Sequence, residues 1–256
     1  SKSIGNVISP LEIIDDYGVD AFRYYFTAHV PTFEDGDFSW DKFESAYNGE
    51  LANDLGNLLA RVIAMIRKYF GGNLSFVGDD NELKDQAETL LGNYKVAMDG
   101  LNLHDAVLAI MEYVHELNQY IERSAPWQVA KLEDKSERQA RLGQVFSTLV
   151  NGLLLVAKYL SPFLPDTAQQ LHQAVGGDSV PETTPIIFPK KSGGDINRND
   201  RRIRLVNIID DGRISAAQRP VQSGTEQPVD HHIMFRKYGG RKIFDHFVQK
   251  YFPIRK

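Results

Sequence analysis

The chain has 256 residues, of which 42% are hydrophobic and 25% are charged, and its net charge is −5. This balance is typical of a soluble globular protein with a buried core, and the length allows more than one domain. Because the chain contains no cysteine, disulfides and thiolate metal sites within it are excluded.

The first predicted element is a short helix with clear signals at both ends. Ser9 is a candidate N-cap, Pro10 takes the first helical position, Glu12 completes a capping box and Gly18 ends the helix. Residues 31–37 are predicted to form a loop. Further helices are predicted at residues 20–29, from about 40 after an N-cap at Ser39, at 50–70 with a stop at Gly71-Gly72, at 81–99, at 104–123, as one turn opened by Pro126, at 136–160 with Ser136 and Gln139 as a capping box, and at 166–174.

The lengths and spacing of these helices predict the fold class. Helices near 20 residues joined by short connections are typical of a mainly α protein built as an antiparallel helical bundle. The longest apolar run, Leu149–Leu160, is about 12 residues long and contains Asn151 and Lys158. It therefore indicates a core helix rather than a membrane span.

Charge divides the chain into two unequal parts. Residues 1–190 carry 15 Lys and Arg against 27 Asp and Glu, a net charge of −12, whereas residues 191–256 carry 14 against 7, a net charge of +7. An acidic body is a poor general binder of nucleic acid, because that affinity comes from neutralised phosphates. Any RNA contact made by the body must therefore depend on a few directed side chains.

One predicted helix, Glu50–Ile66, carries an unusual polar stripe. At about 100° per residue, Asn53, Asn57 and Arg61 share the face opposite the apolar side chains. The neighbouring positions are all small, namely Gly56, Ala60 and Ala64. Two interpretations stay open at this point: an ordinary polar outer face, or a ladder of amide and guanidinium groups with open space beside it, which suits the edges of an unstacked base.

Five segments, in this order, resemble the methionyl-tRNA synthetase family. They are SKSIGNVISP (1–10), YGVDAFRYYF (17–26), EDGDFSWDKF (34–43), LANDLGNLLAR (51–61) and NQYIERSAPWQVAK (118–131). The likeness covers roughly residues 1–190, and the first segment is similar to the end of the KMSKS signature of class I aminoacyl-tRNA synthetases. The resemblance implies the end of the KMSKS loop and a stem-contact region at 1–45, a helical anticodon-binding bundle at 46–177, and a linker with an unassigned basic tail at 178–256.

The resemblance also implies an activity for the parent protein. Members of this family attach methionine to its tRNA with ATP and Mg²⁺, in the cytoplasm and without a membrane. The partners implied are methionine tRNA, methionine and ATP. The nucleotide-binding domain would lie outside this chain, so the chain alone is expected to be inactive and to hold no metal. Two alternatives remain, another class I synthetase and a stand-alone helical tRNA-binding module.

Site residues follow from the matched motifs. Lys2 corresponds to the second lysine of KMSKS, a catalytic residue that stabilises charge as pyrophosphate leaves, and Ser1 and Ser3 are its partners at ATP. Asn53, Asn57 and Arg61 correspond to family positions that read the CAU anticodon, and Trp127 to the tryptophan that stacks on an anticodon base. The alternative for Trp127 is a core residue that seals the bundle. Asn118 and Tyr120 are weaker candidates, and Tyr120 is expected to be core.

The segment after Lys190 departs from the family. A linker, a hairpin turning at Asp211-Gly212 and a weakly helical aromatic end are predicted there. Two interpretations of this segment stay open. It is either a genuine basic extension that holds tRNA or sequence joined by a reading-frame error. His231-His232 lacks any further ligand pattern, so no metal site is predicted.

Overall fold

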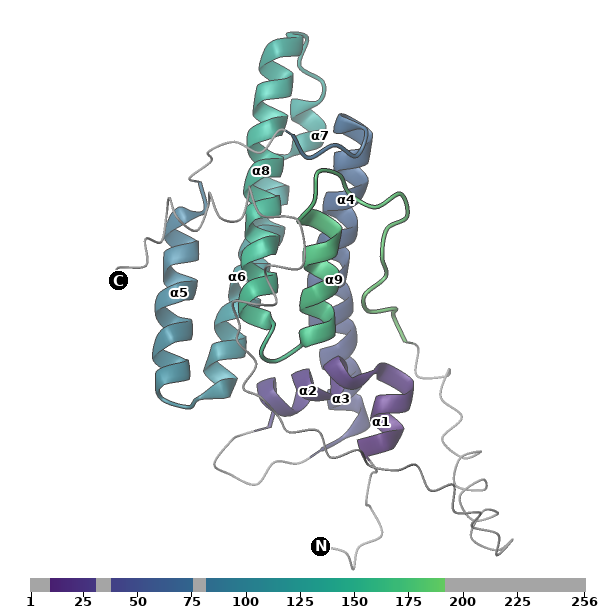
Figure 1. Cartoon of the computed structure of the whole chain (residues 1–256), viewed down its shortest axis with the longest axis vertical. Coiled ribbons are helices and arrows are strands. Elements are labelled where there is room, and N and C mark those ends of the chain that lie inside the picture. The colour runs from purple at the N-terminus through teal and green to yellow at the C-terminus, as the bar shows by residue number, and fades with distance from the viewer. Residues whose placement is uncertain (1–9, 31–37, 76–81, 192–256) are drawn as a thin grey trace, which may run out of the picture. The chain divides into compact units, whose positions relative to one another are not determined.

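The computed structural model describes residues 10–30, 38–75 and 82–191, and among these every regular element is helical (Figure 1). The predicted hairpin and the His231-His232 pair lie outside the described residues. The elements are α1 (Pro10–Tyr17), α2 (Val19–Ala28), α3 (Trp40–Ala46), the π-helix η1 (Tyr47–Gly56), α4 (Asn57–Phe70), α5 (Lys84–Asp99), α6 (Leu103–Ser124), α7 (Pro126–Val129), α8 (Lys135–Leu160) and α9 (Pro165–Val175).

The long helices form the predicted antiparallel bundle. Helices α5, α6, α8 and α9 alternate in direction, whereas α4 runs parallel to α6 (Figure 1). Helix α8 is long and apolar enough to cross a membrane by length and composition, but 83% of its most apolar window is buried in the fold. The prediction that Leu149–Leu160 belongs to a core helix is therefore confirmed.

Local end signals set most of the helix boundaries, with one correction. Ser39 caps α3 by accepting a hydrogen bond from the Lys42 amide at 3.3 Å. Helix α8, however, is capped by Asp134, whose carboxylate accepts from the Glu137 amide at 2.7 Å, and the predicted cap at Ser136 is wrong. A carboxylate is a strong N-cap, and its negative charge is stabilised by the positive end of the helix dipole. The helix therefore begins at Lys135, one residue earlier than predicted.

The segment Tyr47–Gly56 is a π-helix, so the α-helix predicted from Glu50 is wrong over its first turns. In a π-helix each amide bonds to the carbonyl five residues back. The chain turns by less than 100° per residue there, and the α-helical wheel applies only from Asn57 onward. Propensity and periodicity do not reveal this state, because it depends on contacts from other helices.

Glu50 anchors the start of η1 to α2. Its carboxylate accepts a hydrogen bond from the Tyr24 hydroxyl and lies 2.9 Å from His29 Nε2. Burial, followed by the Glu50 carboxylate, raises the pKa of Tyr24 far above its usual value, so Tyr24 stays protonated and donates. This contact fixes one end of the π-helix against the N-terminal helices.

The Glu50 contact predicts a dependence of stability on pH. Burial raises the pKa of Glu50, but the hydrogen bonds from His29 and Tyr24 and the charge of His29 together hold it below the usual 4.5. A lowered pKa in the folded state stabilises the fold above the unfolded value and is lost as pH falls through the folded value. Glu50→Gln should therefore lower the melting temperature at pH 7, and the difference should shrink below about pH 4.5. A constant difference from pH 7 to pH 3 would contradict this linkage.

Two neighbouring side chains also join helix α2 to the start of α9 and to the turn that precedes it. Buried Asp20 accepts hydrogen bonds from the amide and the hydroxyl of Thr167, both at 2.7 Å, in the first turn of α9. Arg23 donates to the carbonyl of Pro162 at 2.8 Å and to that of Phe163, just after α8. One turn of α2 thus binds one amide in the first turn of α9 and two carbonyls of the turn that follows α8. We call this pair the α2 clip.

Candidate nucleic-acid interface

The polar stripe lies on the outside of the bundle, as predicted. Asn53 on η1 and Asn57 at the start of α4 are exposed, and the Arg61 side chain is 31% exposed. Behind them the apolar side chains of the same helices are fully buried, including Leu55, Leu58, Leu59, Val62 and Ile63. Burial of that face fixes the rotation of α4, and this rotation places the two asparagines and the arginine at the surface.

One flank of the stripe is covered by an extended segment, residues 178–189, which we call the strap. It begins beside the end of α4, where the Val180 amide donates to the Gly72 carbonyl and the Leu74 amide to the Asp178 carbonyl, both at 2.9 Å. The strap then runs along α4 and η1. A larger residue at Gly56 would place its Cβ 3.7 Å from Ile187 Cγ1, so the expected open space beside Gly56 is occupied. Ala64 is exposed and Ala60 half-buried.

Side chains of η1 and α4 hold the strap in place. Arg67 donates to the carbonyl of Pro181 at 3.0 Å and to Thr184 Oγ1 at 3.2 Å. The Tyr47 hydroxyl donates to the Pro189 carbonyl at 2.9 Å. Tyr47 also meets the buried ring of Phe188 edge to face, at 5.9 Å between ring centroids. The strap therefore closes one side of the stripe, and helix α6 borders the other.

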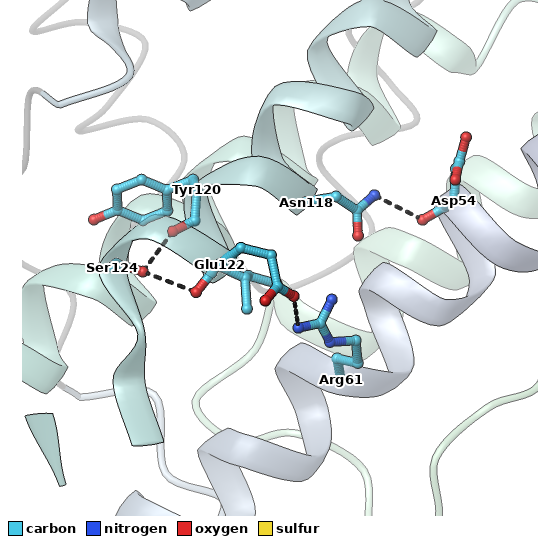
Figure 2. Close-up of polar contacts among 7 residues, drawn as sticks. Asp54, Arg61, Asn118, Tyr120, Glu122 and Ser124 are labelled. Atoms are coloured by element: carbon cyan, nitrogen blue, oxygen red, sulfur yellow. Dashed lines mark hydrogen bonds and ion pairs between the residues drawn. The ribbon is translucent and has the colours of Figure 1, made fainter. Parts of the chain in front are cut away.

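Helix α6 contributes an acidic residue on that side. Glu122 Oε1 lies 2.5 Å from Arg61 Nη2 (Figure 2). The Glu122 side chain is 62% exposed, so the pair stands in solvent and can exchange for another anion at small cost. The sequence gives no signal for this contact, because the two residues lie 61 positions apart.

Asn118 and Tyr120 on α6 have structural positions. Asn118 is half-buried and its side-chain amide donates to the Asp54 carbonyl at 3.1 Å (Figure 2). Tyr120 is 1% exposed, which agrees with the expectation that it is core. Burial, opposed by His115, raises the pKa of the Asp54 carboxyl above its usual value.

Trp127 is a surface residue, and its interpretation as a core tryptophan is wrong. Its side chain is 37% exposed on the short helix α7. Ala125 in the left-handed region, with φ of 41°, followed by Pro126 at the first helical position, turns the chain sharply between α6 and α7. Trp127 follows Glu122 by five residues, so it lies at the end of α6 that contacts Arg61. Residues of α6 thus contact the stripe helices at Asp54 and Arg61, and Trp127 follows the C-terminal end of α6.

The predicted ATP contacts are not tested by the structure. Ser1, Lys2 and Ser3 lie outside the described residues. Within the described part of the chain, no group of three or more His, Asp or Glu side chains is placed to hold a metal ion. The stripe offers amide donors and acceptors, and its single guanidinium is already paired with Glu122.

Comparison with protein families gives two matches along the chain. The model described as tRNA synthetases class I (M) matches residues 1–63, and that of the anticodon-binding domain of tRNA ligase matches residues 80–218. Curated relatives include methionine–tRNA ligases of Streptomyces coelicolor, 38% identical over 183 residues, and of Listeria innocua, 35% identical over 235 residues. These alignments cover 70% and 84% of this chain but 34% and 35% of the relatives. The chain therefore spans about a third of their length.

Solved structures give the same family by shape. Mycobacterium tuberculosis methionyl-tRNA synthetase matches in its free form, with a TM-score of 0.67 and 25% identity. The form bound by methionyl-adenylate matches with a TM-score of 0.68 and 27% identity. The alignments cover 73% and 74% of this chain and 41% of the solved chains.

Proposed function

Because this chain belongs to the anticodon-binding domain family of tRNA ligases and matches the C-terminal region of methionyl-tRNA synthetases, we propose that it recognises the CAU anticodon of methionine tRNA. The observation that carries the proposal is the exposure of Asn53, Asn57 and Arg61 on a helix whose opposite face is completely buried. Exposed Trp127, just after the end of α6, is the proposed aromatic face.

The chemistry of these side chains suits unpaired bases. An asparagine amide offers a donor and an acceptor side by side, so it can pair with one base edge and reject another. Each base of a splayed anticodon also has a face that can stack on an aromatic ring. In the free chain Arg61 is neutralised by Glu122. A phosphate can replace the Glu122 carboxylate at small cost but carries no base identity, so selection among anticodons depends on the amides.

The activity of the whole protein is a wider part of the proposal. We propose a methionine–tRNA ligase that uses methionine, ATP and Mg²⁺ in the cytoplasm, with Lys2, Ser1 and Ser3 at the ATP phosphates. The division into 1–45, 46–177 and 178–256 belongs to the same proposal. The relatives named above are methionine–tRNA ligases, which favours this activity over another class I synthetase or a stand-alone RNA-binding module.

Asn57→Ala tests the proposed reading of the anticodon. Two stem–loop RNAs are compared, one with CAU and one with a single changed anticodon base. The variant should lose about 1–3 kcal/mol of the preference for CAU, the discrimination given by a good bidentate contact. Its melting temperature should barely change, because exposed Asn57 has poorer helix propensity than alanine. Competition binding at fixed salt measures the preference.

A matched control is available on α5. Asn93 is an exposed helical asparagine far along the chain from the stripe, so Asn93→Ala repeats the chemical change without the site. It should keep the full preference for CAU. If Asn57→Ala and Asn93→Ala both discriminate like the wild type, the stripe is only a polar surface and the site assignment fails.

A further inference from the structure

We infer that Asn118 is a positioning residue that holds the junction between η1 and α4 and thereby sets the direction in which Asn57 presents its amide. The inference rests on the proposed function and deepens it. Asn118 acts through the backbone of the neighbouring helix rather than by touching RNA. The observations that carry it are the hydrogen bonds at the junction and the anchoring of η1 at its other end.

The change of helix type falls at Asn57 itself. The Asn57 amide bonds to the carbonyl of Ala52, five residues back, and also to that of Asp54, three residues back. After this point the chain continues as a regular α-helix to Phe70. A residue whose amide is shared between two carbonyls sits where one hydrogen-bond pattern gives way to another, and such junctions leave backbone groups without their regular partners.

Asn118 bonds to a carbonyl at this junction. Its Nδ2 donates to the Asp54 carbonyl at 3.1 Å and to the Val114 carbonyl, one turn earlier on α6, at 3.2 Å (Figure 2). The two hydrogens of one amide nitrogen can serve both acceptors. The bond to Val114 fixes the Asn118 side chain on its own helix, and the bond to Asp54 extends that constraint to η1.

The other end of η1 is held independently. Glu50 is bound by Tyr24 and His29 of the N-terminal helices. It therefore stays in place when the helix type changes further along η1. If the Asp54 carbonyl is released and this stretch tightens toward an α-helix, each residue turns further about the axis. The added rotation about the helix axis must then be accommodated at the junction. As a result, the Asn57 side chain points in a different direction relative to Asn53.

Asn118→Leu tests the positioning role, because leucine keeps a similar size and removes the donor. Amide hydrogen exchange in residues 47–57 of the RNA-free chain should become faster, while exchange in α8 and α9 should stay as in the wild type. The preference for the CAU stem–loop should fall roughly 5- to 150-fold, as for a lost base contact. Asn57→Ala combined with Asn118→Leu should lose no more than either variant alone. Asn118→Asp, which also lacks the donor, should behave like the leucine variant.

A matched control is Gln119→Leu, since Gln119 is the exposed neighbour on α6, and it should change neither measurement. Unchanged exchange in residues 47–57 of Asn118→Leu would overturn the inference whatever the RNA result. Faster exchange in residues 47–57 together with a wild-type preference for CAU would show that the bond is structural and has no positioning role. Losses of preference that multiply in the double variant would lead to the same conclusion. A wild-type chain that cannot tell the two stem–loops apart would instead remove the proposed function, and the positioning role with it.

Discussion

Replacing Trp127 with alanine is expected to weaken binding of every anticodon stem–loop by about 1–3 kcal/mol, or roughly 5- to 150-fold, because base stacking on an aromatic ring has that magnitude and tolerates sequence. The loss should be similar for CAU and for an altered anticodon, in contrast to Asn57→Ala, which should change only the preference. Stability should change little, since the ring is 37% exposed and its removal leaves no large cavity.

The other tryptophan is a natural control, because the chain has only two. Trp40 packs among aromatic rings, including Phe43 at 6.1 Å between centroids. Trp40→Ala should therefore lower the melting temperature and leave RNA affinity unchanged. A Trp40→Phe background leaves Trp127 as the sole indole, so its fluorescence reports stacking directly. Fluorescence that RNA does not change, with Trp127→Ala binding as tightly as the wild type, would remove Trp127 from the site.

Asp20→Ala is expected to lower the free energy of unfolding by about 2–4 kcal/mol. The substitution leaves the buried amide and hydroxyl of Thr167 without their acceptor, and each buried group without a partner costs about 1–3 kcal/mol. Urea unfolding followed by circular dichroism measures the change. The second carboxylate oxygen of Asp20 is buried without a hydrogen-bond partner among the described residues, so its removal offsets part of the loss.

Two further variants isolate the acceptor at this position. Asp20→Asn keeps one oxygen for Thr167 and should lose less stability than Asp20→Ala. Asp15→Ala, an exposed acid on α1, should stay within about 0.5 kcal/mol of the wild type. Equal stability of Asp20→Ala and Asp15→Ala would show that the α2 clip does not hold α2 on the bundle.

Helix positions were predictable because their signals are local. Pro10, Ser39 and Gly71 mark ends through backbone conformation and capping, which depend on a few neighbouring residues. The π-helix was not predictable in this way. Its apolar residues Leu51 and Leu55 also fit an α-helix, and the contacts that accompany the wider turn come from Glu50 meeting α2 and from Asn118 on α6.

The candidate site was predictable only in part, for the same reason. Periodicity placed Asn57 and Arg61 outside the core, which the structure confirms, and the family motif pointed to Trp127. The strap over Gly56 and the pairing of Arg61 with Glu122 join segments far apart in the chain. A single sequence carries the residues of such contacts but not their pairing, so the neighbours of the stripe could be located only from the structure.

The α2 clip has a consequence for the order in which a growing chain can fold. Asp20 and Thr167 are 147 residues apart, and Arg23 is 139 residues from Pro162 and 140 from Phe163. During synthesis from the N-terminus, Asp20 and Arg23 are made long before residues 162–167, which are their partners in the α2 clip. The α2 clip therefore forms late, although the helix that carries it is among the first to be made. A nascent chain that stops before the turn between α8 and α9 lacks every partner of the α2 clip, and α2 keeps only its contacts with earlier elements, such as those of Tyr24 and His29 with Glu50.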